Sequence, residues 1–315
     1  MHESKRFWNS STATLLVQIT RKENIMKVFL LTILFISQIS FGQQPESEAF
    51  WQEALNAPES FAPFPKYNFT EEKKGGLNFA VVGSAFKDLK KFKLDASTAV
   101  GNLMTHEPFK SNSDKISFVR LLKLSNFSCK HSAKMARLLT CDTRAIKKAL
   151  VLAKIKHDKI IVIVNDSQYG GSGGGSVSTI YNGKASARML AHEVGHSFGL
   201  RDEYTYGRTG KLDGKVYANC FAGKPPVKEW NGIADGYFKG CANTNWYRST
   251  KTSLMKTLSG TFNRVSIAVI EAHMAKYISA TPKPKPKPKI IRGSYELIEE
   301  NGKLNINIPN IPCKL

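Results

Sequence analysis

The sequence predicts an α/β protein built on a twisted, mostly parallel sheet. Segments typical of strands and of helices alternate along residues 77–164. The clearest strand is the nearly continuous apolar run at 159–164, a pattern typical of a strand that is buried on both faces. A strand–helix–strand–helix–strand order favours parallel pairing, because each helix carries the chain back to the same edge of the sheet.

Periodicity places the individual elements. Thr143 is a fair cap for the second helix, because its hydroxyl can accept a backbone N–H. Residues 203–250 are rich in Gly, Asn, Tyr and Trp and show little periodicity, so we expect a loop-rich lower lobe there. Strands are expected at 77–82, 116–124 and 159–164, and helices at 86–104, 143–155, 185–200 and 264–278. The inner face of the last helix is expected to hold Ile267, Val269, Ile270, His273, Met274 and Ile278.

Residues 192–202, HEVGHSFGLRD, carry the most specific chemical pattern in the chain. Residues four apart lie on the same face of a helix, so His192 and His196 can offer two imidazoles to one zinc ion. Glu193 stands next to the first imidazole. From there its carboxylate can take a proton from a metal-bound water, as in peptidases that use a His-Glu-x-x-His helix.

The end of this pattern supplies a third ligand. Gly199 permits a sharp turn, because glycine adopts backbone angles that other residues avoid. The turn brings Asp202 back toward the two histidines. Three protein ligands leave a fourth position for water or substrate, which a catalytic zinc site requires.

This extended motif resembles that of the IgA peptidase family of metallopeptidases, in the metzincin clan. The resemblance covers roughly residues 77–279. It implies a zincin fold, with an active-site helix and a loop-rich lower lobe closed by a C-terminal helix. It also implies one zinc ion on His192, His196 and Asp202, peptide hydrolysis with Glu193 as base, and a methionine turn at Met255. The segments that carry it are LNFAVVG at 77–83, EPFKS at 107–111, IIVIVN at 160–165, YGGSG at 169–173, the motif with its trailing Asp-Glu-Tyr, and WYR at 246–248.

Two features depart from the family pattern. The spacing between His196 and Asp202 is a residue tighter and matches other Asp-type metzincins. No tyrosine follows Met255 closely, so Tyr204 and Tyr247 are the candidates for support of the oxyanion.

Residues 170–175 hold five glycines and lack the Lys-Ser/Thr that completes a phosphate-binding loop. We expect a flexible connection to an edge strand near 176–180. In metzincins a strand beside the cleft pairs with extended substrate through main-chain hydrogen bonds, and we expect this segment to do the same. A plain surface loop is the alternative.

Composition limits the partners. The 315 residues include 46 Lys and Arg against 25 Asp and Glu, a formal net charge of +21. Such a charge favours anionic partners, among them the polymers of a cell envelope. The basic residues are spread along the whole chain and form no motif of a nucleic-acid module, so specific nucleic-acid binding is not expected.

The first residues predict export. Met26 and Lys27 precede a mostly apolar run at 28–41, which suits the core of a signal peptide and is shorter than the ~20 residues that span a bilayer. Small residues at 40–42 place the cleavage before Gln43, and Met26 is the expected working start. We expect a secreted or periplasmic protein with no transmembrane span in its mature form. An uncleaved N-terminal anchor is the alternative.

Five cysteines fit an oxidising compartment. Cys129 with Cys141, and Cys220 with Cys241, are close enough in sequence to close local loops, and each bridge would add ~2–4 kcal/mol. The sequence alone leaves the connectivity open, and Cys313 would remain over. None has the C-x-x-C spacing of a structural zinc site.

The C-terminal part predicts a spacer and a small tail. Residues 281–289, TPKPKPKPK, favour an extended polyproline helix that like charges stiffen. Asn301-Gly302 between two strand-like segments predicts a β-hairpin. The expected organisation is a leader at 1–42, an N-terminal strap at 43–76, a zinc metallopeptidase domain at 77–280, a Lys-Pro linker at 281–289 and a hairpin tail at 290–315.

Together these features predict an exported zinc endopeptidase that acts on protein or peptide substrates, with Glu193 as general base. The alternative is a non-catalytic basic surface protein with a structural zinc ion. Glu193 favours the enzyme, since a purely structural site has no use for a base at that position.

Overall fold

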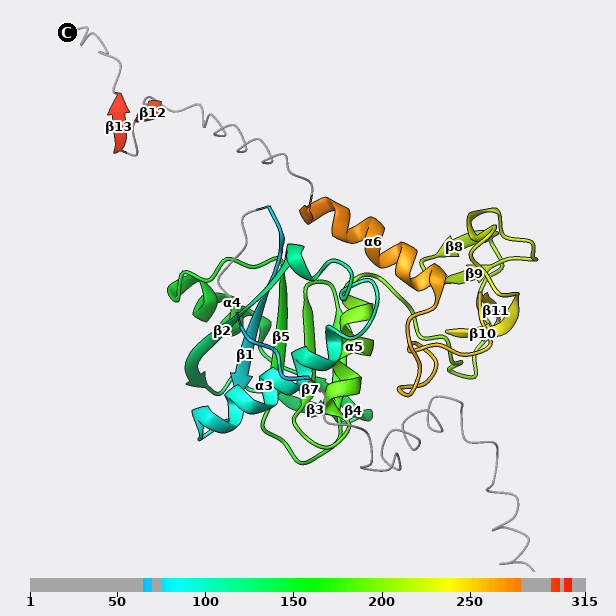
Figure 1. Cartoon of the computed structure of the whole chain (residues 1–315), viewed down its shortest axis with the longest axis horizontal. Helices are drawn as coiled ribbons and strands as arrows, with labels where there is room; N and C mark the ends of the chain where they lie inside the picture. Colours follow the sequence, from blue (N-terminus) through cyan, green and yellow to red (C-terminus); the bar gives the residue numbers. More distant parts are fainter. Residues whose placement is uncertain (1–64, 70–74, 279–295, 301–302, 308–315) are drawn as a thin grey trace, which may run out of the picture.

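The main feature of the molecule is a seven-stranded sheet with the strand order β2-β1-β5-β7-β6-β4-β3 (Figure 1). The computed structural model of the protein describes residues 65–69, 75–278, 296–300 and 303–307. The strands of this sheet are β1 (Leu77–Ser84), β2 (Ile116–Ser125), β3 (Lys130–Ser132), β4 (Met135–Thr140), β5 (Lys159–Val164), β6 (Gly171–Gly174) and β7 (Val177–Tyr181).

The sheet is mixed and mostly parallel, as the sequence predicts. β1 pairs in parallel with β2 and with β5, and β5 pairs in parallel with β7. All residues of β5 are buried, which explains its continuous apolar run. β6 runs antiparallel to β7, and the antiparallel pair of β3 and β4 extends the sheet beyond β6. This last pair is a feature that the strand pattern did not predict.

In the described part of the chain, four helices accompany the sheet. α3 and α5 lie side by side on one face, and α5 packs directly on β6 and β7 (Figure 1). α4 begins one residue after Asp142, whose carboxylate accepts the N–H groups of Arg144 and Ala145. The cap is therefore Asp142, and Thr143, which we expected in that role, is the first helical residue. The helices are α3 (Leu89–Leu103), α4 (Thr143–Leu152), α5 (Ser186–Ser197) and α6 (Arg264–Ile278), with 3-10 turns η1 (Ser113–Lys115) and η2 (Lys228–Trp230).

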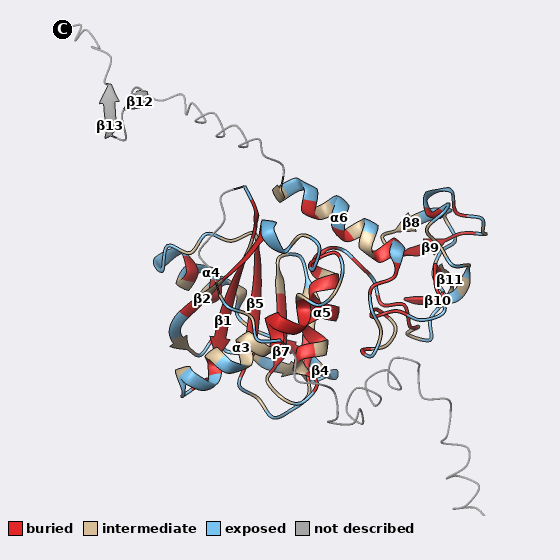
Figure 2. Ribbon diagram, in the orientation of Figure 1, coloured by how far each residue is buried: buried red, intermediate tan, exposed pale blue. Residues whose placement is uncertain are grey.

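The core lies between the sheet and these helices, and α5 is among its most deeply buried elements (Figure 2). On the neighbouring strands β1 and β2, the rings of Phe79 and Phe118 stack at 4.8 Å between centroids. The described end of the N-terminal strap packs on the same body, because the backbone N–H of Tyr67 donates to the carbonyl of Ser97 in α3 at 3.1 Å.

The lower lobe is more ordered than its composition suggests. Within it lies an antiparallel sheet with the order β10-β11-β9-β8. These strands are short, so their sequences show little of the alternation of apolar and polar residues that predicts a strand. They are β8 (Lys215–Tyr217), β9 (Cys220–Ala222), β10 (Phe238–Cys241) and β11 (Asn243–Arg248).

Two disulfides staple the fold, and both pairings agree with the sequence spacing. Cys129–Cys141 closes the loop that contains β3 and β4, and Cys220–Cys241 joins β9 to β10 in the lower lobe. The remaining cysteine, Cys313, lies outside the described residues.

α6 closes the molecule at the bounds expected from sequence. Its inner face is narrower than expected. Of the expected residues, Ile270 and Met274 are buried, whereas Ile267, Val269, His273 and Ile278 are half-buried. Val265 and Ser266 are buried in addition.

The predicted C-terminal hairpin is present as β12 (Glu296–Glu300) and β13 (Lys303–Asn307), which pair antiparallel. The leader, most of the strap and the Lys-Pro linker lie outside the described residues. Within the described part of the chain, no helix combines the length and the apolar character needed to cross a bilayer.

Candidate active site

α5 brings the central residues of the motif into the core. His192 and Glu193 are 1% and 3% exposed, and His196 in the next turn is half-buried. The helix is held by an apolar face at helical spacing, as the sequence predicts. This face consists of Met189, Leu190 and Val194, which are all fully buried.

The chain reverses directly after α5. Gly199 has a φ of 90°, in the left-handed region that favours glycine. Its N–H donates to the carbonyl of His196 at 2.9 Å, and the N–H of Leu200 donates to the carbonyl of Gly195 at 3.1 Å. These bonds close the end of the helix, as glycine-containing caps do. The turn predicted at Gly199 is confirmed, and it returns Asp202 to the two histidines.

Three possible ligand atoms converge at this point. The Nε2 atoms of His192 and His196 are 3.1 Å apart, and they lie 3.2 and 3.3 Å from Oδ1 of Asp202. Three ligands of a tetrahedral zinc ion, each ~2.0–2.1 Å from the metal, lie roughly 3.3 Å from one another. The triangle therefore has the size that one such ion requires. Among the described residues, these three form the group that could hold a metal ion.

Hydrogen bonds orient both imidazoles. Nδ1 of His192 lies 3.1 Å from the carbonyl of Leu254, and Nδ1 of His196 lies 2.9 Å from the carbonyl of Leu200. Because a carbonyl only accepts, each Nδ1 carries the proton and each Nε2 presents a lone pair to Asp202. The buried Oδ1 of Asp202 receives no hydrogen bond within the described part of the chain. Lone pairs that converge in a buried site are unfavourable unless a cation lies between them.

Asp202 accepts a hydrogen bond from a neighbouring tyrosine. The hydroxyl of Tyr206 donates to the second carboxylate oxygen, Oδ2. Burial raises the pKa of the Tyr204 and Tyr206 phenols, so both remain protonated donors. Tyr206 was not singled out from sequence, where only its closeness to Asp202 indicated a role.

Glu193 faces the same space as the three ligand atoms. Burial raises the pKa of its carboxyl. Its Oε1 lies against β6, since a Cβ on Gly171 would come within 2.8 Å of it. A carboxylate with a raised pKa beside a metal position is suited to accept and return a proton.

The glycine run forms a strand and is not a flexible connection. A strand does follow it near 176–180, but this strand does not lie at the edge of the sheet, so that prediction is wrong. β7 pairs on one side with β5 and on the other with β6, so it has no edge to offer to a substrate. The glycines form β6, where small size lets the strand lie directly on α5. A Cβ on Gly173 would lie 2.1 Å from the Glu193 carbonyl oxygen and 2.8 Å from Cβ of His196. The high glycine content suggests a flexible segment, but it is explained by the close approach of β6 to the backbone of α5.

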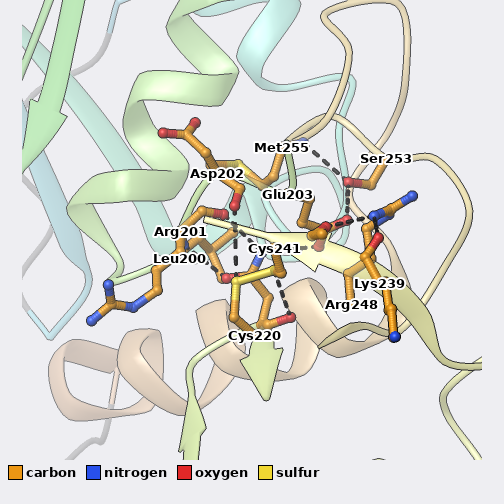
Figure 3. Close-up of a disulfide and its surroundings, with 12 residues drawn as sticks. Leu200, Arg201, Asp202, Glu203, Cys220, Lys239, Cys241, Arg248, Ser253 and Met255 are labelled. Atoms are coloured by element: carbon orange, nitrogen blue, oxygen red, sulfur yellow. Dashed lines mark hydrogen bonds between the residues drawn. A yellow bond between two sulfur atoms is a disulfide. The ribbon is translucent and has the colours of Figure 1, made fainter. Parts of the chain in front are cut away.

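Met255 lies beneath α5, fully buried, with its sulfur against Gly195. Its carbonyl accepts the N–H of Glu203 at 2.8 Å, and its own N–H donates to the hydroxyl of Ser253 at 3.2 Å. The residue next to Asp202 is thereby tied to the segment that carries Met255 (Figure 3).

Glu203 is a buried carboxylate that the sequence analysis did not assign. Its Oε2 accepts the hydroxyl of Ser253 at 2.7 Å, and its Oε1 accepts the amides of Asn219 and Asn263 at 2.9 and 2.8 Å. Burial raises the pKa of Glu203, and these three bonds oppose the rise. Figure 3 shows Glu203 and Asp202 beside the Cys220–Cys241 disulfide. Glu203 therefore joins the third ligand to the lower lobe.

Lys159 fixes the far end of α5. It is 7% exposed, and its Nζ donates to the carbonyls of Ser197 and Gly175 at 2.6 and 3.0 Å. Ser197 ends α5, and the carbonyls at a helix C-terminus attract positive charge. Burial lowers the pKa of Lys159. The sequence pattern predicted a strand at this residue and gave no indication of the contact.

A cavity of about 220 Å³ opens over the three ligands and Glu193. Tyr204 lines it, whereas Tyr247, the other tyrosine considered for oxyanion support, packs in the lower lobe near Phe221 and Trp230. Strand β4 also contributes to the lining of the cavity, through Met135, Arg137 and Leu138. The paired cysteines at 129 and 141 were the one sequence feature that marked this segment as a closed loop.

The comparison with known families adds to this geometry. Residues 128–217 match the family model described as IgA Peptidase M64. The matched segment runs from the β3–β4 hairpin through the three ligands to β8. It is shorter than residues 77–279, over which the sequence resembles this family. The matched segment thus carries the whole metal-ligand group. No curated protein matches the chain.

Several solved structures are similar to parts of the chain. Archaemetzincin from Methanopyrus kandleri is 13% identical over 64% of this chain and 97% of that chain, at a TM-score of 0.31. Metalloproteinase-II from Bacteroides fragilis is 16% identical over 51% of this chain and 52% of that chain, at 0.27. A chain of a chaperone–substrate complex is 16% identical over 64% of this chain and 34% of that chain, at 0.33. The present chain thus spans about half the length of metalloproteinase-II and about a third of the length of the chain in the chaperone–substrate complex.

The close packing of β6 on α5 predicts a strong effect of one methyl group. Gly173→Ala should lower the free energy of unfolding by about 1–3 kcal/mol or more, because the new Cβ overlaps the backbone of Glu193. It should also weaken metal binding, because His196 must move. Urea unfolding and zinc titration measure the two effects.

Ser176→Ala is the control, since Ser176 follows the same strand and only its backbone carbonyl is used, by the N–H of Ile160. It should leave both quantities near the parent values. Parent-like stability and zinc affinity in Gly173→Ala would contradict the packing described here.

Proposed function

We propose that the chain is a zinc-dependent endopeptidase in which His192, His196 and Asp202 bind one zinc ion and Glu193 is the general base. One observation carries the proposal. Three ligand atoms form a triangle with sides of 3.1 to 3.3 Å, and one of them, the buried Oδ1 of Asp202, has no hydrogen-bond donor in the described part of the chain. Two imidazole nitrogens and one carboxylate oxygen are a donor set typical of catalytic zinc.

The number of ligands favours catalysis over a structural role. Structural zinc sites are closed by four protein ligands, whereas catalytic sites use three and leave a position open. The group has three members among the described residues, and a cavity of about 220 Å³ lies over it. This supports the enzyme over the alternative of a surface protein with a structural ion.

Zinc in this site would polarise the scissile carbonyl and lower the pKa of a water molecule toward ~7. The residues of the chain then act on protons. Glu193 accepts the proton of the attacking water and returns it to the leaving amine, a use for which its raised pKa is favourable. The protonated phenol of Tyr204 lines the cavity and can donate a hydrogen bond to developing negative charge, whereas the Tyr206 hydroxyl donates to Asp202. Met255 supports α5 from below.

Export is part of the proposal. The signal-peptide pattern at 26–42 lies outside the described residues, and two disulfides support an oxidising compartment, outside the cytosol. The site would act there on proteins or peptides, and the excess of basic residues would hold the enzyme near anionic envelope polymers.

Expression from Met26 in a bacterial host with an outer membrane tests export. The mature protein in the periplasm or medium should begin at Gln43 in N-terminal sequencing. A cytoplasmic product that retains residues 26–42 would contradict the proposal.

Two substitutions separate chemistry from metal binding. Glu193→Ala should retain zinc and lower cleavage of an unfolded protein by about 10²–10⁴-fold, because the base is lost. His196→Ala should lose the metal itself. Zinc content by mass spectrometry and turnover with and without a chelator give both results.

Glu271→Ala is the matched control, since Glu271 is exposed on α6. It should keep zinc and turnover. If Glu193→Ala cleaved at the parent rate, or if chelation left the parent active, the proposed mechanism would be wrong.

A further inference from the structure

The β3–β4 hairpin, which forms part of the cavity lining, is firmly held. β3 and β4 pair antiparallel, and the Cys129–Cys141 disulfide ties the ends of the loop. β4 pairs with β6 at Gly171, so the hairpin is part of the main sheet. His131 adds two contacts, one from Nδ1 to the carbonyl of Ala136 and one from Nε2 to Asp166 at 3.2 Å. A side chain on β4 is therefore held in a defined place above the ligands.

Arg137 is the β4 side chain with a permanent charge at this place. It is half-buried and lines the cavity together with Glu193 and the three ligands. Of the residues that line the cavity in the described part of the chain, Arg137 is the single Arg or Lys.

The balance of charge makes this arginine important for a substrate. The lining contains two carboxylates, Glu193 and Asp202, and a divalent cation on the ligands would balance them. With Arg137 the loaded cavity is positive. Met135 and Leu138, which are 40% and 37% exposed, flank Arg137 on the same rim and present apolar surface to the cavity. A guanidinium beside apolar walls attracts an anion more strongly than one in open water.

We propose that Arg137 is a specificity-determining residue that binds an acidic side chain of the substrate next to the scissile bond. The inference rests on the proposed peptidase function and names its substrate class. A guanidinium holds a carboxylate by two parallel hydrogen bonds, which gives direction as well as attraction. The excess of Lys and Arg over Asp and Glu attracts acidic proteins in general.

A carboxylate in the cavity could also come from the free C-terminus of a peptide. The open cleft and the position of Arg137 within a sheet rim favour a side chain of a chain that continues in both directions. Peptides blocked by acetylation and amidation separate the two sources, since they retain side-chain carboxylates only. Preferential cleavage that requires a free C-terminus would overturn the proposal.

The test uses blocked fluorogenic peptides in matched pairs, with Glu or Gln at each position from three before to three after the scissile bond. The zinc-loaded parent should prefer Glu over Gln at one position by about 10–100-fold in kcat/KM, the range of a charge-assisted hydrogen bond. Arg137→Gln should reduce this ratio to about one. Arg137→Lys should keep part of the ratio, because charge remains without the fork.

Lys134→Gln is the matched control, since Lys134 is exposed in the turn of the same hairpin and does not line the cavity. It removes an equal charge and should keep the parent ratio. Loss of the ratio in this variant as well would show that overall charge, not Arg137, selects the substrate, and would overturn the proposal. Zinc content and melting temperature confirm that each variant is folded and loaded.

The possible failures are distinguishable. If the parent cleaves Glu and Gln peptides equally, or if Arg137→Gln lowers both rates by the same factor, the specificity role is wrong while the peptidase function stands. An equal loss of rate with the Glu and Gln peptides would instead indicate that Arg137 stabilises the transition state. If the loaded parent cleaves no blocked peptide and no unfolded protein, the proposed function itself fails, and this inference fails with it.

Discussion

The structure depends on the convergence of three lone-pair atoms in a buried place. Two imidazole nitrogens and a carboxylate oxygen lie within 3.3 Å of one another, and two backbone carbonyls turn the imidazoles so that both lone pairs face inward. Without a cation this arrangement is repulsive and poorly solvated. The surrounding fold holds it together: α5 is buried, the glycine turn returns Asp202, and Glu203 anchors the next residue to the lower lobe.

That convergence explains features that have no local cause. β6 consists largely of glycine because it lies against the backbone of α5, and Lys159 is buried because it meets the carbonyl end of the same helix. Each is unfavourable alone, since glycine weakens a strand and burial penalises a charge. Both are compensated by fixing the helix that carries two ligands and the base. The fold thus accepts locally unfavourable features that hold the site in its geometry.

Local patterns predicted the parts of the fold that local physics determines. The buried strand β5, the helix α6 and the turn at Gly199 follow from periodicity and backbone freedom. Sequence spacing made the two observed disulfides possible but left the connectivity open. The role of the glycine run, the Glu203 contacts and the β3–β4 hairpin could not be predicted, because each depends on a segment distant in sequence. The same is true of Arg137, which reaches the site only because β4 adds to the sheet next to β6. A motif therefore predicts the ligands, whereas the tertiary fold decides what surrounds them.

X-ray absorption spectroscopy at the zinc edge, on the purified and zinc-loaded protein, tests the central claim most directly. The account predicts one zinc ion per chain with nitrogen and oxygen neighbours at ~2.0–2.1 Å, two of them imidazoles, and no sulfur. One of the neighbours should exchange with an added anion, since one position is open to the cavity. A sulfur neighbour at ~2.3 Å, or a fourth neighbour that is a protein side chain and does not exchange, would contradict the account.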